Sequence, residues 1–283
     1  MIEPFGKPVR PHLERLIRRA QNNLLVATPF ISAYQARWLV DAAHHGTQPP
    51  RLKVLTSINE KSVASGALEI KALKEFQTGL PSSEVINLPR LHAKVYIADS
   101  DLAVITSANL TMGGLKGNYE YGVSIESRDV VTRIRKDMEY YACIGNPLTD
   151  EELASLCDLG GRLRAAAKKL SRTTEGPDSR QFQALLRKMR SPVLEAQVGR
   201  RTTNAVFSNA VRFVLRDGPL STRQIHPKIK ELLPDLCDDH AELIINGQRF
   251  GKQWKHDVRN AQVTLSKAGI IALERGKWVL VQR

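Results

Sequence analysis

Hydrophobic and polar positions in the first half of the chain follow two periods in turn. Leu13, Leu16 and Ile17 are spaced as on one face of a helix, whereas NLLVATPFI (residues 23–31) is a short apolar run, as in a buried strand. This pattern predicts helices at residues 11–21, 33–44, 62–76 and 129–141, and strands at residues 23–31, 52–58, 84–88, 91–98, 102–108 and 119–126. Helices alternating with strands imply an α/β fold, a sandwich with helices on both faces of a mixed sheet.

The strand pattern stops near residue 149. Residues 151–170 and 180–189 have helical spacing, and 11 basic but only 3 acidic residues occupy positions 162–201. Three further helices and a two-stranded hairpin follow, predicted at residues 204–215, 222–233, 252–268, 270–274 and 277–282. Because three helices followed by a hairpin are typical of a winged helix, we divide the chain into three parts: an α/β domain (1–148), a basic helical connector (149–203) and a winged-helix domain (204–283).

Charge separates the two halves of the chain. Lys and Arg total 42 against 29 Asp and Glu, a net charge of +13; residues 1–150 carry 18 basic and 15 acidic residues (+3), and residues 151–283 carry 24 and 14 (+10). So uneven an excess favours a polyanionic partner, and we expect nucleic acid. A solvated basic face and lipid headgroups are the alternatives. With no membrane-length apolar run and no signal-peptide pattern, we expect a cytoplasmic protein without a membrane partner.

The predicted helix at residues 252–268 has an apolar and a polar face. Its apolar stripe consists of Trp254, Val258, Ala261 and Leu265. The side chains that we expect to project away from this stripe are Lys252, Lys255, His256, Arg259, Asn260 and Gln262. Side chains of these types bind phosphates and base edges, so we predict a DNA-binding face. A protein–protein module with a solvated polar face is the alternative.

Four polar side chains that could take part in catalysis lie on two successive predicted strands. His92 and Lys94 are two residues apart, as are Ser107 and Asn109, so each pair shares a face of its strand. A hairpin closed by residues 100–101 would set His92 opposite Asn109 and Lys94 opposite Ser107. A structural accident explains such a cluster poorly, because unpaired polar groups on an apolar sheet are unfavourable. A phosphate-binding site explains it better, because the site would use an imidazole nucleophile, an ammonium group, and hydroxyl and amide donors.

The spacing of these residues resembles the HKD motif of the phospholipase D superfamily, H-x-K-x4-D-x6-G-S-x-N, with Thr106 where the pattern usually has Gly. The resemblance implies a phospholipase D-like αβα sandwich, a covalent intermediate on His92, and no metal or other cofactor. Glu120 occupies the position at which the nuclease branch of the family typically has a glutamate that orients the imidazole. The alternative is that Glu120 is an ordinary charged residue at the edge of a strand. Asp99 is expected to cap the turn. Three glycines are expected in a turn: Gly113, Gly114 and Gly117.

The chain holds one copy of the motif. In-line displacement at phosphorus needs a nucleophile on one side and a proton donor on the other, and one histidine cannot fill both places. In the family that this chain resembles, single-copy members form symmetric homodimers with the active site at the interface. The resemblance therefore implies a homodimer with a shared active site.

The C-terminal stretch GKQWKHDVRNAQVTLSKAGII (residues 251–271) resembles winged-helix domains attached to restriction enzymes. Together the two resemblances imply a metal-independent DNA endonuclease of the restriction or defence type. The alternatives are a phospholipase or phosphatidyl transferase that acts on lipids, and a DNA-binding regulator with an inactive nuclease fold.

Overall fold

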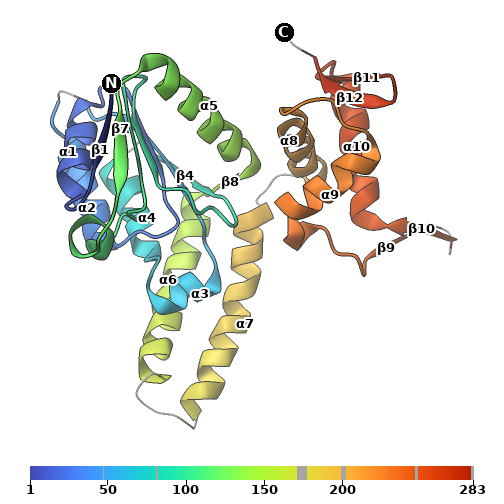
Figure 1. Ribbon diagram of the computed structural model, residues 1–283. Helices are drawn as coiled ribbons and strands as arrows, with labels where there is room; N and C mark the ends of the chain where they lie inside the picture. The colour runs from blue at the N-terminus through green and yellow to red at the C-terminus, as the bar shows by residue number, and fades with distance from the viewer. Residues whose placement is uncertain (47, 81, 171–176, 199–201, 246–247, 282–283) are drawn as a thin grey trace. The chain divides into compact units, whose positions relative to one another are not determined.

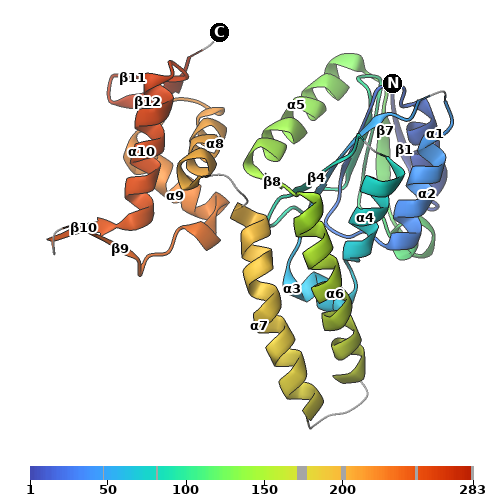
Figure 2. The same ribbon diagram turned by 180° about the vertical axis from the view of Figure 1, so that it is seen from behind.

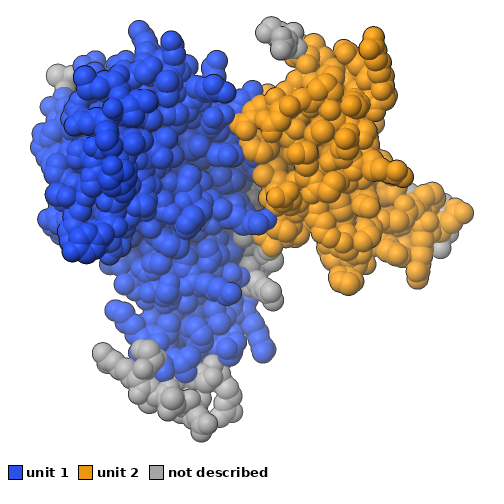
Figure 3. Space-filling model, viewed as in Figure 1, with its two compact units in different colours: residues 1–199 blue, residues 200–283 orange. Residues whose placement is uncertain are grey.

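The structure is a computed structural model of the chain, and it describes all residues except 47, 81, 171–176, 199–201, 246–247 and 282–283. The chain forms two compact units, Met1–Gly199 and Arg200–Arg283 (Figure 3). The helices expected to form a connector, α6 (Asp150–Leu170) and α7 (Pro177–Val198), lie in the first unit. There α6 packs against α7 and against two helices of the α/β layer.

The first unit is built on one mixed eight-stranded sheet in the order β1-β7-β6-β5-β2-β3-β4-β8. β2, β3 and β4 run parallel, and the other neighbours are antiparallel. The strands are β1 (Ile2–Phe5), β2 (Asn23–Ala27), β3 (Arg51–Thr56), β4 (Glu84–Asn87), β5 (Val95–Ala98), β6 (Leu102–Thr106), β7 (Gly122–Ile125) and β8 (Asn146–Pro147). This confirms the predicted α/β fold with a mixed sheet. β1 and β8 lie at the sheet's edges and have no continuous apolar run, so the pattern did not reveal them.

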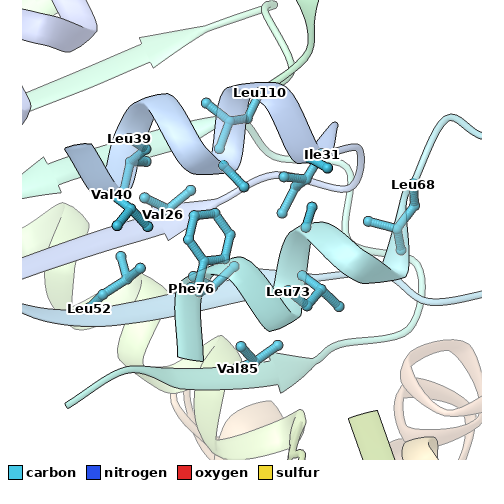
Figure 4. Packing of buried hydrophobic residues seen from close by; sticks show 14 of the residues in the cluster. Val26, Ile31, Leu39, Val40, Leu52, Leu68, Leu73, Phe76, Val85 and Leu110 are labelled. Atoms are coloured by element: carbon cyan, nitrogen blue, oxygen red, sulfur yellow. The ribbon is translucent and has the colours of Figure 1, made fainter. Parts of the chain in front are cut away.

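Helices cover both faces of this sheet. On one face lie α1 (Arg10–Arg19), α2 (Ala33–Ala43) and α4 (Ile70–Gly79), and on the other lies α5 (Arg128–Ile144) (Figures 1 and 2). Val26 of β2 joins the core beneath the first group, where it lies near Phe76 and Leu39 (Figure 4). Successive strand residues point to opposite faces, so the fully buried Leu25 faces the α5 side.

The helix predicted at residues 62–76 is divided into α3 (Glu60–Ser65) and α4. Gly66 ends α3 in the left-handed conformation, with φ 76°, which glycine adopts without the steric cost of a Cβ. The carboxylate of Glu69 then accepts a hydrogen bond from the backbone N–H of Ala33 (2.8 Å) and forms an ion pair with Arg164 of α6. These contacts hold Glu69 at the start of α4.

The second unit contains α8 (Thr203–Leu215), α9 (Thr222–Leu232), α10 (Gln253–Lys267) and a hairpin of β11 (Ile271–Glu274) and β12 (Lys277–Leu280). A short 3-10 turn, η2 (Pro234–Leu236), and a two-stranded ribbon, β9 (Glu242–Ile245) with β10 (Gln248–Lys252), separate α9 from α10. The stripe of four apolar residues on α10 is buried, as predicted. The ribbon was not expected, and the winged-helix assignment stays a prediction.

Candidate functional site

The hairpin of β5 and β6 carries the motif, but in a register that differs by one residue from the prediction. Val95 pairs with Ile105 and Ala98 with Leu102, so residues 99–101 form a three-residue turn. The backbone N–H of Thr106 donates to the carbonyl oxygen of Lys94 at 3.1 Å. The expected pairing of Lys94 with Ser107 is therefore wrong.

Asp99 accounts for this shift. It has a left-handed backbone, with φ 45°, and is the first residue of the turn after the last β5–β6 pair, Ala98 with Leu102. Its carboxylate accepts hydrogen bonds from the backbone N–H groups of Gln21, Asn22 and Asn23, at 2.8, 3.0 and 2.8 Å. Nε of Arg135 donates to its carbonyl oxygen at 2.8 Å. Asp99 thus has a structural role, which it exerts on the start of β2 rather than on its own turn.

The four polar residues come together at the opposite end of the hairpin from Asp99. His92 and Lys94 precede β5 and Ser107 and Asn109 follow β6, so antiparallel pairing brings both segments to one end of the sheet. Nζ of Lys94 lies 3.2 Å from Nε2 of His92 and donates to the His92 carbonyl oxygen at 2.8 Å. An ammonium group can only donate, so Nε2 of the imidazole is the acceptor and carries a lone pair.

Partial burial lowers the pKa of Lys94, and the negative charge of Glu120 partly offsets this effect. The carboxylate of Glu120 has hydrogen-bond partners other than the imidazole. One oxygen accepts from Oγ of Ser107, and the other accepts from Nδ2 of Asn118 at 3.1 Å. In this structure Glu120 therefore contacts Ser107 and Asn118, and its role in orienting His92 stays a prediction.

Asn109 is held by two features that the sequence reasoning missed. Oγ1 of Thr28, just after β2, donates to Oδ1 of Asn109 at 3.3 Å. Gly114 in the π-helical turn η1 (Gly113–Gly117) packs on the Asn109 backbone so closely that a Cβ would lie 2.3 Å from its carbonyl oxygen. A polar residue inside the apolar run of residues 23–31 was the available signal for Thr28, and adjacent glycines were the signal for a close backbone approach.

Only some of the side chains expected to project from α10 are exposed to solvent. Arg259 and Asn260 are exposed. Gln262 is 2% exposed, and its amide exchanges hydrogen bonds with Oγ1 of Thr222 at 3.3–3.4 Å, so its expected projection is wrong. Its place on the helix turns it toward α9 rather than toward solvent.

The remaining polar side chains near the start of α10 have partners within the second unit. Nζ of Lys252 pairs with Oδ1 of Asp239 at 2.9 Å, and Nε2 of His256 lies 2.7 Å from the Phe250 carbonyl oxygen. Nζ of Lys255 lies 5.6 Å from the ring centroid of Trp254. Lys255 and His256 remain partly exposed, whereas Lys252 is tied by an ion pair.

Groups of three or more His, Cys, Asp or Glu side chains suited to a metal ion do not occur among the described residues. Within the same part of the chain, no helix combines the length and apolar character needed to cross a bilayer.

Comparison with known proteins identifies a domain within the first unit. The family model described as "Cardiolipin synthase, PLD-like domain" matches residues 13–142. Nuc, a phospholipase D family member from Salmonella typhimurium, is 16% identical with a TM-score of 0.45, over 53% of this chain and 99% of its own. NucT from Helicobacter pylori is 19% identical (TM-score 0.38; 50% and 92% covered), and phosphatidylserine synthase from Haemophilus influenzae is 14% identical (TM-score 0.46; 65% and 47% covered). No curated protein matches the chain in sequence. Residues 13–142, which carry the histidine–lysine pair on a mixed sheet, are a phospholipase D-like domain.

Proposed function

We propose that this protein is a DNA endonuclease that hydrolyses phosphodiester bonds through a phosphohistidine and needs no metal ion. The observation that carries the proposal is the pair formed by Nε2 of His92 and Nζ of Lys94, 3.2 Å apart. Ser107 and Asn109 lie at the same end of the sheet. The pair supplies a nucleophile and a positive charge for the phosphate oxygens, and the other two side chains supply hydrogen-bond donors.

In the proposed reaction, Nε2 of His92 attacks phosphorus and the bond to the leaving oxygen breaks as that oxygen takes up a proton. Water then attacks the phosphorus and the phosphorus–nitrogen bond breaks, which frees His92. One proton of this water returns to the group that protonated the leaving oxygen. Lys94 and Asn109 stabilise the negative charge that gathers on the phosphoryl oxygens in both steps.

The proton for the leaving oxygen has to come from the side opposite the nucleophile. We assign it to His92 of the partner subunit in a symmetric homodimer. A mixed dimer of wild-type and His92→Ala subunits, purified with two different tags, tests this assignment. It should be almost as inactive as the double variant, because either the nucleophile or the acid is missing. Half of the wild-type activity would show that each chain works alone.

The second unit is proposed to bind the DNA as a winged helix. Residues 200–283 carry 15 Lys and Arg against 8 Asp and Glu, a net charge of +7. The exposed Arg259 and Asn260 are adjacent on α10, where they are available to phosphates and base edges. We propose that a DNA-reading unit and a nuclease unit in one chain form a restriction or defence enzyme.

Incubation of the purified full-length protein with plasmid DNA in excess EDTA tests the function. Cleavage should persist for the wild type and for Lys74→Ala, which removes an exposed lysine on α4, and it should vanish for His92→Ala and Lys94→Ala. Strict dependence on magnesium would contradict the mechanism. Hydrolysis of phospholipid vesicles without DNA cleavage would favour the lipid enzyme, and DNA binding without cleavage would favour the regulator.

A further inference from the structure

Two tyrosines beside the candidate site are unusually exposed. Tyr119 is 95% exposed and Tyr121 is 65% exposed, and they flank Glu120 in the chain. Aromatic side chains bury a large apolar area when they have a partner, so neighbouring exposed rings indicate an interaction surface. We name Tyr119, Tyr121 and Lys7 the aromatic patch.

Lys7 gives this patch a positive charge. Its Nζ lies 4.8 Å from the ring centroid of Tyr119 and donates to the Gly117 carbonyl oxygen at 2.9 Å. β1, the edge strand, pairs with β7 through Phe5 and Gly122, and this pairing places the segment that follows Phe5 beside the tyrosines. An ideal Cβ at Gly6 would lie 3.9 Å from Cδ2 of Tyr121, an ordinary contact distance.

The segment that carries the two tyrosines is hydrogen-bonded to a proposed catalytic residue, Ser107. The backbone N–H of Tyr121 donates to Oγ of Ser107 at 3.1 Å, and its carbonyl oxygen accepts from the Ser107 N–H at 3.0 Å. The same Ser107 hydroxyl donates to Glu120, whose charge acts on Lys94. These bonds place the segment that carries the two tyrosines next to Ser107.

We propose that the aromatic patch stacks an unpaired nucleobase of the DNA, next to the phosphodiester that is cut. This inference rests on the proposed nuclease function and adds a preference for single-stranded or unpaired DNA. Exposed aromatic rings stack on bases of any sequence, and a nearby cation strengthens the attraction to the backbone. In a duplex the faces of a base are already covered by its stacked neighbours, so only an unpaired base can use the patch.

Binding to the full-length His92→Ala protein tests the proposal without cleavage. A fluorescent single-stranded oligonucleotide and the duplex of the same sequence serve as probes, and Tyr119→Ala and Tyr121→Ala are added in turn. Stacking energies per base predict a single-strand affinity about five- to a hundredfold lower in each. Duplex affinity should not change. Tyr119→Phe, which keeps the ring, and Tyr140→Ala, which truncates a tyrosine on α5, should bind both probes normally.

Equal losses for both probes, no loss, or a loss in Tyr119→Phe as large as in Tyr119→Ala would overturn the proposal. So would a change in oligomeric state in sedimentation, because the patch would then be a contact between two copies. If the wild type cuts no DNA while Tyr119→Ala still loses single-strand affinity, the nuclease function fails and the stacking site stands. If DNA is cut but single-strand affinity does not change, the stacking site fails alone.

Discussion

Replacing Gly114 with alanine tests whether the turn η1 fixes the position of Asn109. A Cβ at Gly114 would lie 2.3 Å from the Asn109 carbonyl oxygen and 2.8 Å from its nitrogen. Both neighbours are backbone atoms, which cannot swing aside as the end of a side chain can. The added methyl group must therefore displace η1, the Asn109 backbone or both until the contact reaches a normal van der Waals separation.

The expected cost follows from this forced movement. Overpacking by one methyl group costs about 1–3 kcal/mol of unfolding free energy. In a unit the size of Met1–Gly199 each kcal/mol lowers Tm by about 2–4 °C, so we expect Tm to fall by about 2–12 °C. Activity should fall further than stability suggests, since displacing a catalytic group by about 1 Å can cost about a hundredfold in rate.

Thermal unfolding and the rate of DNA cleavage below Tm measure the two effects separately. Gly117→Ala is the matched control in the same turn, because its nearest neighbour is the Met112 carbonyl oxygen at 3.9 Å. It should leave Tm and rate within error of the wild type. If Gly114→Ala behaves like this control, the backbone contact does not constrain Asn109. A lower Tm with normal activity would show that Asn109 has no catalytic part.

Three further results are expected. Asp99→Ala should lower the unfolding free energy by about 1–3 kcal/mol in denaturant titrations, because three backbone N–H groups lose their acceptor, and Asp101→Ala should not. The second unit should lose stability as the pH falls from 6.5 toward 4: burial lowers the pKa of His226 to about 4, so the unfolded chain binds the proton first, and His226→Phe should flatten this dependence. Gln262→Ala should cost about 1 kcal/mol of stability, whereas Asn260→Ala should spare stability and cost about 1–3 kcal/mol of base discrimination, measured with matched and mismatched duplexes.

Alternation of apolar periods was sufficient to predict the α/β sheet and the buried stripe of α10, because both depend on local repetition. The register of β5 and β6 was not predictable in this way. It depends on Asp99, whose carboxylate binds backbone groups 76–78 residues earlier in the chain. The sequence alone favoured a two-residue turn, whereas the tertiary contacts of Asp99 accompany a three-residue turn in the structure.

The surroundings of Gln262 and Glu120 could not be predicted for a related reason. Gln262 lies next to Ala261 of the apolar stripe, and only the packing of α9 decides that its amide faces Thr222. Glu120 was placed from a family resemblance, which indicates a position but not which of several nearby donors the carboxylate selects. In this structure Ser107 and Asn118 are the donors. Helical and strand periods define a face of an element, whereas partners across the fold decide what that face meets.

Contacts with the central strand β2 explain the spacing of residues in the motif. Asp99 binds the backbone at the start of β2, and Thr28 binds Asn109 just beyond its end. Between these two attachments β5 pairs with β2 from Ala98 to Val95, so four strand residues separate Asp99 from Lys94. Inserting or deleting one residue in β5 would keep only one attachment in register and would turn Lys94 to the other face of the sheet. The Asp99 carboxylate takes no part in the proposed chemistry. Its place in the motif therefore follows from its contacts with the start of β2, which fix one end of β5 and so the position of the histidine–lysine pair at the other.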